Sequence, residues 1–241
     1  MAESARSISA DTPAPGARDP SRERASPEPR WLGLTGRQVA GLAAVVVAAQ
    51  LPFALYLARG EAPIAAVVPF EDDFNRAELG ASYAVTGGHW RLENGVLRSP
   101  GVKNNPLWLQ AKLPDDVAVE FDVRAESPDG DIKCEIFGNG YDHASGYVVV
   151  FGGWTNSISV LARLDEHGQD RKESRALKVA KGKTYHFRVE RKASLLRWIL
   201  DGKLAMELDD RAPLRGRGHD RFGFSSWESD LYFDNLMITP L

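Results

Sequence analysis

A run of twenty apolar residues near the N-terminus constrains this chain more than any other feature. Residues 39–58, VAGLAAVVVAAQLPFALYLA, carry no charge, and only Gln50 and Pro52 interrupt their apolar character. As a helix rising about 1.5 Å per residue, this run is about 30 Å long, which matches the hydrocarbon core of a bilayer. The sequence therefore predicts a transmembrane anchor over residues 38–59, in contact with lipid through residues 39–58.

The distribution of arginines predicts the orientation of this anchor. Arg59 alone follows the apolar run closely, whereas the preceding segment contains Arg18, Arg22, Arg24, Arg30 and Arg37. Because short basic segments tend to stay in the cytoplasm, we expect a single-pass membrane protein with its N-terminus cytoplasmic and its C-terminal domain periplasmic or extracellular. A cleaved signal peptide is the alternative, but its apolar region is usually only about 7–15 residues long.

Composition divides the rest of the chain into three parts. Residues 1–37 are rich in proline, serine and mixed charges and have little to bury, so they are expected to form a disordered cytoplasmic arm. Residues 60–69 are interpreted as a linker. Residues 70–241 are long enough for one domain with its own core.

Charge and cysteine content exclude some classes of partner and of stabilisation. The net charge of −3 gives no basic surplus, so nucleic acid is not expected as a partner. Cys134 is the single cysteine, so no intramolecular disulfide can form. It alternates with Ile132 and Ile136, which predicts a buried strand residue and not a nucleophile.

The C-terminal domain shows the two-residue period of β-strands. Apolar and charged residues alternate in 117–124, VAVEFDVR, whereas 146–151, GYVVVF, is apolar on both faces and predicts a central strand. Asn94-Gly95 and Asp201-Gly202 separate pairs of such runs and predict hairpins. With roughly ten to twelve strands and no convincing helix, the domain is predicted to be an all-β sandwich.

Four of the six tryptophans divide between the expected core and the expected loops. Trp90 and Trp198 lie in alternating strand patterns and are expected to pack in the core. Trp108 and Trp227 lie beside predicted loops, where a ligand could reach them.

Short motifs along the domain carry a resemblance to a known superfamily. They are FEDDFNR at 70–76, HWRLENGVL at 89–97, EFDVR at 120–124, FGF at 222–224 and LYFDNLMI at 231–238. In this combination and order they resemble the concanavalin A-like lectin and glucanase superfamily, and most closely the 3-keto-disaccharide hydrolase-like domains, also described as family-16 glycosidase-like. The resemblance implies a two-sheet jelly-roll sandwich with paired terminal strands, in which the concave sheet often binds glycan.

The catalytic pattern of the related glucanases is not matched. They place their carboxylates as Glu-x-Asp-x-Glu or Glu-x-Asp-x-x-Glu, whereas here Arg124 follows Glu120 and Asp122, and Glu126 falls one position late. Retaining hydrolysis needs two carboxyl groups about 5–5.5 Å apart. We therefore interpret this strand face as solvated, and a hydrolase would have to use carboxylates from the set Glu120, Asp122, Asp165 and Glu166.

The segment from Phe151 to Arg171 holds the densest cluster of residues suited to binding a sugar. An aromatic face can stack on the C–H surface of a sugar ring, and planar polar groups can bind paired hydroxyls. The predicted ligand-binding residues are Trp154, Asn156, Arg163, Asp165, Glu166 and His167. The alternative is a hairpin with a solvated turn and internal ion pairs.

No cofactor is predicted, with calcium as the one open possibility. Asp73 and Asp234, near the two ends of the domain, are candidate calcium ligands, although no Asp-x-Asp-x-Asp-Gly loop is present. The histidines lack the paired spacing of zinc ligands, and there is no phosphate-binding loop or dinucleotide fingerprint.

Three functions fit these patterns. The leading hypothesis is a membrane-tethered, extracytoplasmic domain that binds carbohydrate at the cell envelope. The alternatives are a glycoside or 3-keto-glycoside hydrolase and a protein-interaction sandwich without a glycan site.

Overall fold

The computed structural model describes residues 33–241, which form two separate units. One contains helix α1 (Gly36–Leu57), and the other is the compact domain Gly60–Leu241. The predicted disordered arm, residues 1–37, lies almost entirely outside the described residues.

Helix α1 begins at a well-formed N-cap. Thr35 accepts a hydrogen bond from the backbone N–H of Gln38, and the Gln38 side chain accepts one from the backbone N–H of Thr35, 2.9 Å away. This reciprocal capping box fixes the start of the helix. The helix includes Pro52 and buries none of its side chains, and it is long and apolar enough to cross a membrane. Its bounds lie within two residues of those predicted, while the crossing itself stays a prediction.

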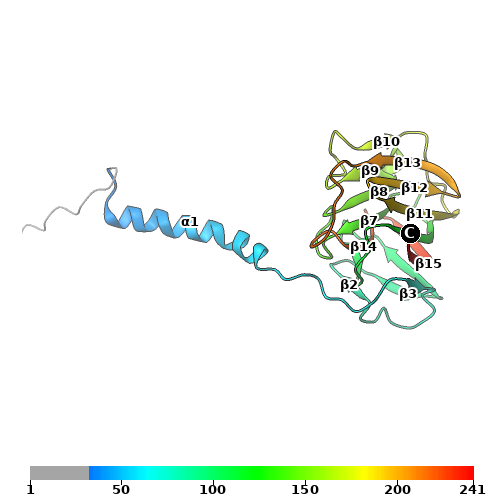
Figure 1. The fold of residues 1–241 in the computed structure, drawn as a ribbon, viewed down its shortest axis with the longest axis horizontal. Coiled ribbons are helices and arrows are strands. Elements are labelled where there is room, and N and C mark those ends of the chain that lie inside the picture. The colour runs from blue at the N-terminus through cyan, green and yellow to red at the C-terminus, as the bar shows by residue number, and fades with distance from the viewer. Residues whose placement is uncertain (1–32) are drawn as a thin grey trace, which may run out of the picture. The chain divides into compact units, whose positions relative to one another are not determined.

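The domain consists of two antiparallel β-sheets (Figure 1), which confirms the predicted all-β sandwich. The first sheet has the strand order β13-β12-β11-β6-β15-β4-β3, with β1 paired to β15, and the second has the order β10-β9-β8-β7-β14-β5-β2. The strands are β1 (Phe70–Asp72), β2 (Tyr83–Val85), β3 (Arg91–Glu93), β4 (Val96–Pro100), β5 (Leu107–Leu109), β6 (Val117–Ala125), β7 (Ile132–Gly138), β8 (Tyr147–Gly152), β9 (Ile158–Arg163), β10 (Lys172–Ser174), β11 (Thr184–Lys192), β12 (Leu195–Leu200), β13 (Lys203–Asp209), β14 (Arg221–Ser226) and β15 (Asp230–Pro240).

Two sequence-level predictions about strand pairing are confirmed. Strand β1 pairs with β15 in the register Phe70↔Ile238, so the two ends of the domain lie side by side as the resemblance implies. Asn94-Gly95 connects β3 to β4, and Asp201-Gly202 connects β12 to β13. All four turn residues have positive φ, between 49° and 78°, which is the geometry of a two-residue hairpin loop.

Aromatic side chains from both sheets interlock to form the core. The ring of Phe224 on β14 lies 4.4 Å from that of Phe233 on β15 and 5.1 Å, edge to face, from that of Phe121 on β6. Trp198 also lies in this core, and Trp90 is buried there as predicted. Cys134 is buried in β7, which confirms its predicted position, and burial raises the pKa of its thiol.

The second sheet is covered on its outer face as well. Strands β7 and β8 are buried at every position, which confirms that GYVVVF contributes a central strand. A small second cluster, formed by Val148, Val150, Ile158, Val160 and Ala162, packs beneath Trp154 on this outer face.

The segment predicted as a linker, residues 60–69, packs against the domain. The buried guanidinium of Arg221 donates a hydrogen bond to the carbonyl of Ala62 at 2.8 Å. The backbone N–H groups of Ala65 and Ala66 both donate to the carbonyl of Gln110, at 2.8 and 3.1 Å. The segment therefore belongs to the same compact unit as the domain.

Replacing Phe224 by alanine tests the aromatic core. Since the ring is fully buried among aromatic side chains, Phe224→Ala should lower the free energy of unfolding by about 3–5 kcal/mol. Urea unfolding of the domain, followed by tryptophan fluorescence, measures this change. Leu204→Ala, at a side chain that is 56% exposed, should stay within about 0.5 kcal/mol of the wild type. Equal effects of the two substitutions would contradict this assignment of the core.

Candidate functional site

A buried lysine lies at the centre of the candidate site. In β7 the side chains of Ile132, Cys134 and Ile136 pack in the core, so Lys133 and Glu135 point to the outer face of the second sheet. The side chain of Lys133 is only 2% exposed. An ammonium group at such a position has to be paired, because leaving a buried charge uncompensated is expensive.

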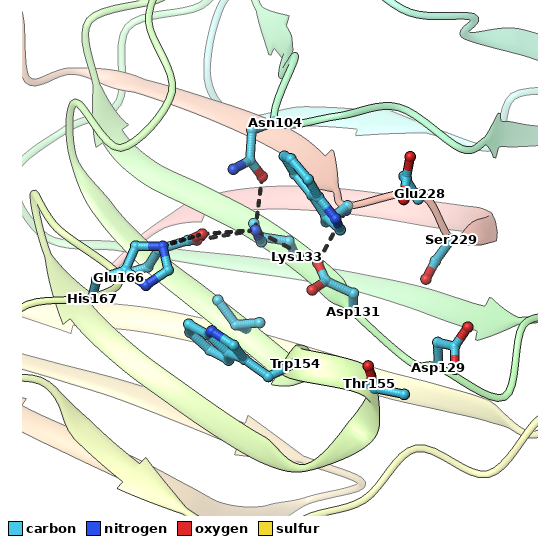
Figure 2. Close-up of a pocket in the computed structure, with 12 residues that line it drawn as sticks. Asn104, Asp129, Asp131, Lys133, Trp154, Thr155, Glu166, His167, Glu228 and Ser229 are labelled. Atoms are coloured by element: carbon cyan, nitrogen blue, oxygen red, sulfur yellow. Dashed lines mark hydrogen bonds and ion pairs between the residues drawn. The ribbon is translucent and has the colours of Figure 1, made fainter.

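Three oxygen-bearing side chains surround this ammonium group (Figure 2). The Nζ atom of Lys133 donates a hydrogen bond to Oδ1 of Asn104 at 2.8 Å and lies 3.0 and 3.2 Å from the two carboxylate oxygens of Glu166. Oδ1 of Asp131 lies 3.5 Å away on the other side. Lys133 thus joins the loop before β5, the loop after β9 and the start of β7.

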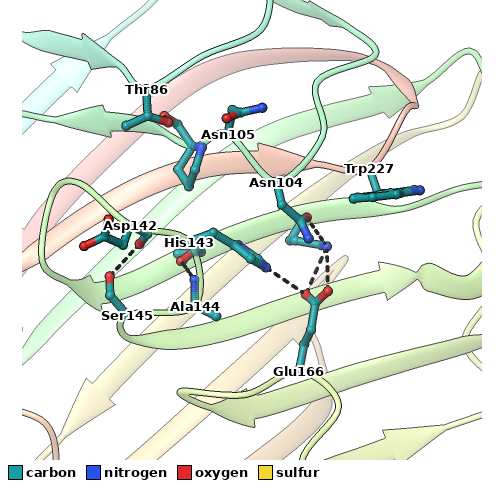
Figure 3. Close-up of polar contacts among 12 residues, drawn as sticks. Thr86, Asn104, Asn105, Asp142, His143, Ala144, Ser145, Glu166 and Trp227 are labelled. Carbon is teal, nitrogen blue, oxygen red and sulfur yellow. Dashed lines mark hydrogen bonds and ion pairs between the residues drawn. The ribbon is translucent and has the colours of Figure 1, made fainter. Parts of the chain in front are cut away.

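The same carboxylate connects to a second buried pair (Figure 3). Nε2 of His143 lies 3.6 Å from Oε2 of Glu166, and its Nδ1 lies 2.6 Å from Oε1 of Glu135. The backbone N–H of Ala144 donates to the other oxygen of Glu135 at 2.8 Å. Glu135 is completely buried, so it supports the site from below and does not reach the pocket.

These contacts shift the pKa values of the carboxyl and imidazole groups. Burial alone would raise the pKa of Glu166, but His143 and Lys133 outweigh it and lower that pKa to about 2. Burial alone would lower the pKa of His143, but Glu135 and Glu166 raise it to about 9. Burial raises the pKa of Glu135, although its hydrogen bond with His143 opposes this shift. Burial also raises the pKa of Asp131.

A pocket of about 450 Å³ opens above this network. Trp154 and Trp227 both line it, and Trp227 is 49% exposed. The guanidinium of Arg171 lies 5.2 Å from the centre of the Trp154 ring and covers one of its faces. The lining residues are Asn104, Asp129, Asp131, Lys133, Val150, Trp154, Thr155, Glu166, His167, Trp227, Glu228 and Ser229.

A left-handed turn, α2 (Gly153–Asn156), holds Trp154 in place. Trp154, Thr155 and Asn156 have φ angles of 51°, 57° and 56°, a conformation that costs about 1–2 kcal/mol for each residue with a β-carbon. Asn156 secures the turn from outside the pocket. Its amide nitrogen donates to the carbonyls of Pro128 and Val179, and its oxygen accepts the N–H of Val179. Such strain is retained only where the surroundings enforce it.

Two buried oxygen atoms at the pocket accept or donate no hydrogen bond among the described residues. They are Oε2 of Glu166, which has only its ion-pair contacts, and Oγ of Ser229. Most buried polar atoms in proteins have a hydrogen-bond partner. Since Glu166 is paired with Lys133, only Oγ of Ser229 among these two atoms has unfilled hydrogen-bonding capacity beside the pocket.

The structure brings three of the six predicted ligand-binding residues together. Trp154, Glu166 and His167 line the pocket, and the His167 ring meets the Trp154 ring edge to face at 5.3 Å. Their role in binding stays a prediction.

The other three do not line the pocket, because each is engaged in a structural contact. Asn156 holds the left-handed turn, as described above. Arg163 donates to Oδ2 of Asp210 at 2.8 Å and ties β9 to the loop after β13. Asp165 accepts the backbone N–H of His167 at 2.8 Å and shapes the turn that follows β9.

The catalytic candidates on β6 belong to the other sheet. Glu120 and Asp122 both contact His186 on β11, at 3.3 and 2.9 Å, and Glu120 also pairs with Arg188. Burial opposes protonation of His186, but Asp122 and Glu120 outweigh it and raise its pKa. These groups therefore form a cross-strand ion network on the first sheet, remote from the pocket in the fold.

The calcium candidates do not form a ligand cluster. Asp73 accepts the N–H of Asn75 at 3.0 Å, and Asp234 accepts the N–H of Asn235 at 2.8 Å. Burial and the neighbouring charges of Asp122 and Asp73 raise the pKa of Asp234. Within residues 33–241, no group of three or more His, Cys, Asp or Glu side chains is positioned to hold a metal ion.

Sequence reasoning missed several pocket residues that come from distant segments. Lys133 lies in an alternating strand pattern and is not among the predicted site residues. A lysine and a glutamate on one face of a strand that precedes the apolar GYVVVF run do, however, indicate charged groups on a covered face of the sheet. Trp227 was noted as a loop residue, and it does reach the pocket, whereas Trp108 is fully buried. Asn104 and Ser229 gave no recognisable signal.

Comparisons with known proteins identify the fold. No protein-family model matches the sequence, and no curated protein matches it. Among solved structures, the chain is similar to carbohydrate binding module CBM66 from Bacillus subtilis, with 16% identity and a TM-score of 0.56 over 66% of this chain and 95% of that one. It is also similar to the Bacillus licheniformis β-glucanase, with 11% identity and a TM-score of 0.52 over 71% and 98%.

The domain is a concanavalin A-like jelly roll. A third similar structure, the carbohydrate recognition domain of Emp47p, agrees with 14% identity and a TM-score of 0.51 over 72% of this chain and 96% of that one. The predicted jelly-roll fold is thereby confirmed, and at these identities the likeness shows the fold alone.

The pH dependence of stability tests the Glu135–His143–Glu166 network. Because the pKa of His143 is raised from 6.5 to about 9 in the folded state, its stabilising effect is complete below pH 6.5 and is lost as the pH rises through about 9. Urea unfolding between pH 6 and 10 should show this loss in the wild type and a flatter curve in His143→Gln. The exposed His89→Gln should keep the wild-type curve, and identical curves for wild type and His143→Gln would contradict the assignment.

Proposed function

We propose that this protein binds carbohydrate in the pocket on the outer face of the second sheet and that helix α1 tethers it to a membrane. The observation that carries the proposal is a pocket lined by two tryptophans, Trp154 and Trp227, together with polar side chains. A ligand with an apolar ring face and many hydroxyl groups suits both the aromatic and the polar part of this lining.

The tryptophans supply the apolar part of such a site. One face of Trp154 is covered by Arg171, so its remaining surface is available to a ring lying in the pocket. Trp227, which also lines the pocket, is half exposed. Rigid aromatic rings offer a large contact area with little loss of conformational entropy.

The polar groups supply directional contacts. The amide nitrogen of Asn104 can donate a hydrogen bond to a hydroxyl, because its Oδ1 is already bonded to Lys133, and the exposed carboxylate of Asp129 can accept one. Glu166 and Asp131 compensate the charge of Lys133. Because both carboxylates contact its ammonium group, Lys133 in turn holds them in position.

The charge of the pocket favours neutral sugars over acidic ones. Four carboxylate-bearing residues line it, namely Asp129, Asp131, Glu166 and Glu228; Glu166 is paired with Lys133 and Glu228 with Lys103, which leaves the carboxylates in excess. A uronate or sialate carboxylate would meet like charges there, which is a strong means of rejecting a ligand.

The fold supports this proposal without establishing it. Among the structural neighbours are a carbohydrate binding module and a carbohydrate recognition domain, so the same two-sheet scaffold serves sugar binding elsewhere. For the tether, the length and composition of α1 and the arginines that precede it favour a single-pass anchor with the domain in the periplasm or outside the cell.

Replacing Trp154 by alanine tests the binding site. In ligand-detected NMR of residues 60–241 with neutral oligosaccharides, Trp154→Ala should weaken binding about tenfold or more, since the stacked ring supplies about 1.4 kcal/mol or more. Acidic oligosaccharides should bind more weakly than neutral ones to the wild type.

Asp122→Asn, on the first sheet, is the matched control and should bind like the wild type. Binding that survives Trp154→Ala but not Asp122→Asn would place the site on the first sheet. Silence across a broad panel of glycans would favour the protein-interaction sandwich.

Hydrolysis of the bound glycoside is the second candidate, favoured by one observation. Asp131 and Glu166 both line the pocket and both contact Nζ of Lys133, so their nearest oxygens are at most about 6.5 Å apart, a limit that includes the separation of about 5–5.5 Å in a retaining pair. Their pKa values are shifted in opposite directions, as those of an acid and its ionised partner are. Lys133 opposes this role, because it occupies the space between the two carboxyl groups.

Prolonged incubation with neutral oligosaccharides and 3-keto-disaccharides separates the two candidates. A binding module leaves every substrate intact over hours. A hydrolase releases product, and Asp131→Asn and Glu166→Gln should each reduce the rate about a hundredfold or more, since each removes an acid or base group. Product release that persists in both variants would exclude this pair as the catalytic groups.

A further inference from the structure

Large apolar side chains gather at one end of the domain, away from the pocket. Ile64 and Val67 are 57% and 76% exposed and line a groove of about 360 Å³. Pro240 closes the groove, and the next residue, Leu241, is 49% exposed. The other residues lining the groove are Ala66, Val68, Lys112, Leu113 and Pro114. We call this surface the basal groove.

The basal groove is a fixed feature of the domain. The backbone N–H groups of Ala65 and Ala66 donate to the carbonyl of Gln110. These bonds hold groove residues 64–68 beside groove residues 112–114. The N–H of Leu241 donates to the carbonyl of Asp116 at 3.2 Å. The backbone that carries the exposed apolar side chains of the basal groove is therefore hydrogen-bonded to the domain, and these side chains face solvent.

The basal groove and the sugar pocket lie at opposite ends of the same strands. The N–H of Leu113 donates to the carbonyl of Asp220, next to Arg221, which pairs with Gly138 at the end of β7. The pocket instead uses Asp131, before β7, and Trp227, after β14. At about 3.3 Å per residue, the seven residues of β7 separate the two regions by about 20 Å.

We propose that the basal groove docks on the lipid surface of the membrane that α1 crosses, with Ile64, Val67 and Leu241 in the interfacial layer. This inference rests on the proposed membrane anchoring. Helix α1 ends at Leu57, only seven residues before Ile64, so a fully extended chain holds the groove within about 25 Å of the end of the helix. Because residues 60–68 are the first of the domain after α1, this surface is close in sequence to the proposed membrane anchor, whatever the orientation of the two units.

A lipid surface fits the groove better than a second copy of this chain. A stable dimer usually buries about 800 Å² on each partner, which three exposed side chains and a small groove do not supply. Interfacial insertion has no such minimum, because its strength follows the apolar area that leaves water. The charges beside the groove are mixed, since Lys112 pairs with Glu61, so a zwitterionic surface is sufficient.

Docking in this way gives the domain a defined direction on the membrane. The basal groove faces the lipid, and the pocket is carried at the far end of β7 and β14, about 20 Å away from it. A glycan in the surrounding medium or cell wall could then reach the pocket without displacing the domain from the bilayer.

The test uses the full chain in phosphatidylcholine proteoliposomes. Cys134 is buried and unreactive, so Val67→Cys can be labelled alone with a nitrobenzoxadiazole fluorophore. Docking predicts a blue-shifted emission and quenching by doxyl-labelled phosphatidylcholine. The matched control, Leu204→Cys, replaces an equally apolar exposed side chain elsewhere on the domain and should show neither effect. Adding Ile64→Asn to Val67→Cys should reduce the quenching at least twofold, whereas adding Leu204→Asn should not.

Three results would overturn the proposal. An unquenched label at position 67, in a chain that resists extraction by alkaline carbonate, would exclude docking while leaving the membrane anchor intact. Extraction of the chain by carbonate would contradict the anchor and the docking together. A blue shift that grows with the protein-to-lipid ratio, and that doxyl lipid does not quench, would assign the groove to a second copy of the chain.

Discussion

The ammonium group of Lys133 is the constraint on which the candidate site depends. Its side chain is almost fully buried on the outer face of β7, so oxygen atoms from other segments have to surround it. Asn104 reaches it from the loop before β5 and Glu166 from the loop after β9, which closes two otherwise distant loops over the sheet. Through Glu166 the same charge is linked to His143 and Glu135. The positions of the side chains at the floor of the pocket thus depend on compensation of the Lys133 charge, whereas the sandwich beneath it is stabilised by aromatic packing.

Local patterns in the sequence were sufficient for most of the fold. Two-residue periodicity predicted the long strands, and Asn-Gly and Asp-Gly predicted two hairpins, because these signals act over a few adjacent residues. The domain, residues 60–241, has fifteen strands where roughly ten to twelve are predicted, and five of them are only three residues long, which is too short to show a period.

The site was only partly predictable for a related reason. The segment 151–171 contains Trp154, Glu166 and His167, which line the pocket, but it also contains Arg163 and Asp165, whose contacts are structural. Composition cannot tell in which direction a polar side chain points. Lys133 and Trp227 join the pocket through strand pairing between β7 and β14, which is a long-range property of the fold. The jelly-roll scaffold is shared with sugar-binding and sugar-cleaving proteins, so the chemistry has to be argued from these side chains.

The left-handed turn at Trp154 has a consequence for how this pocket could change over evolution. The turn is kept in a conformation that its own residues disfavour by the amide of Asn156, which is bonded to backbone atoms of Pro128 and Val179. Substitutions around those two anchor points, neither of which contacts the pocket, would let the indole swing to a new position. Affinity for a ligand can therefore drift through residues that never touch it, and two homologues with identical pocket side chains can differ in what they retain.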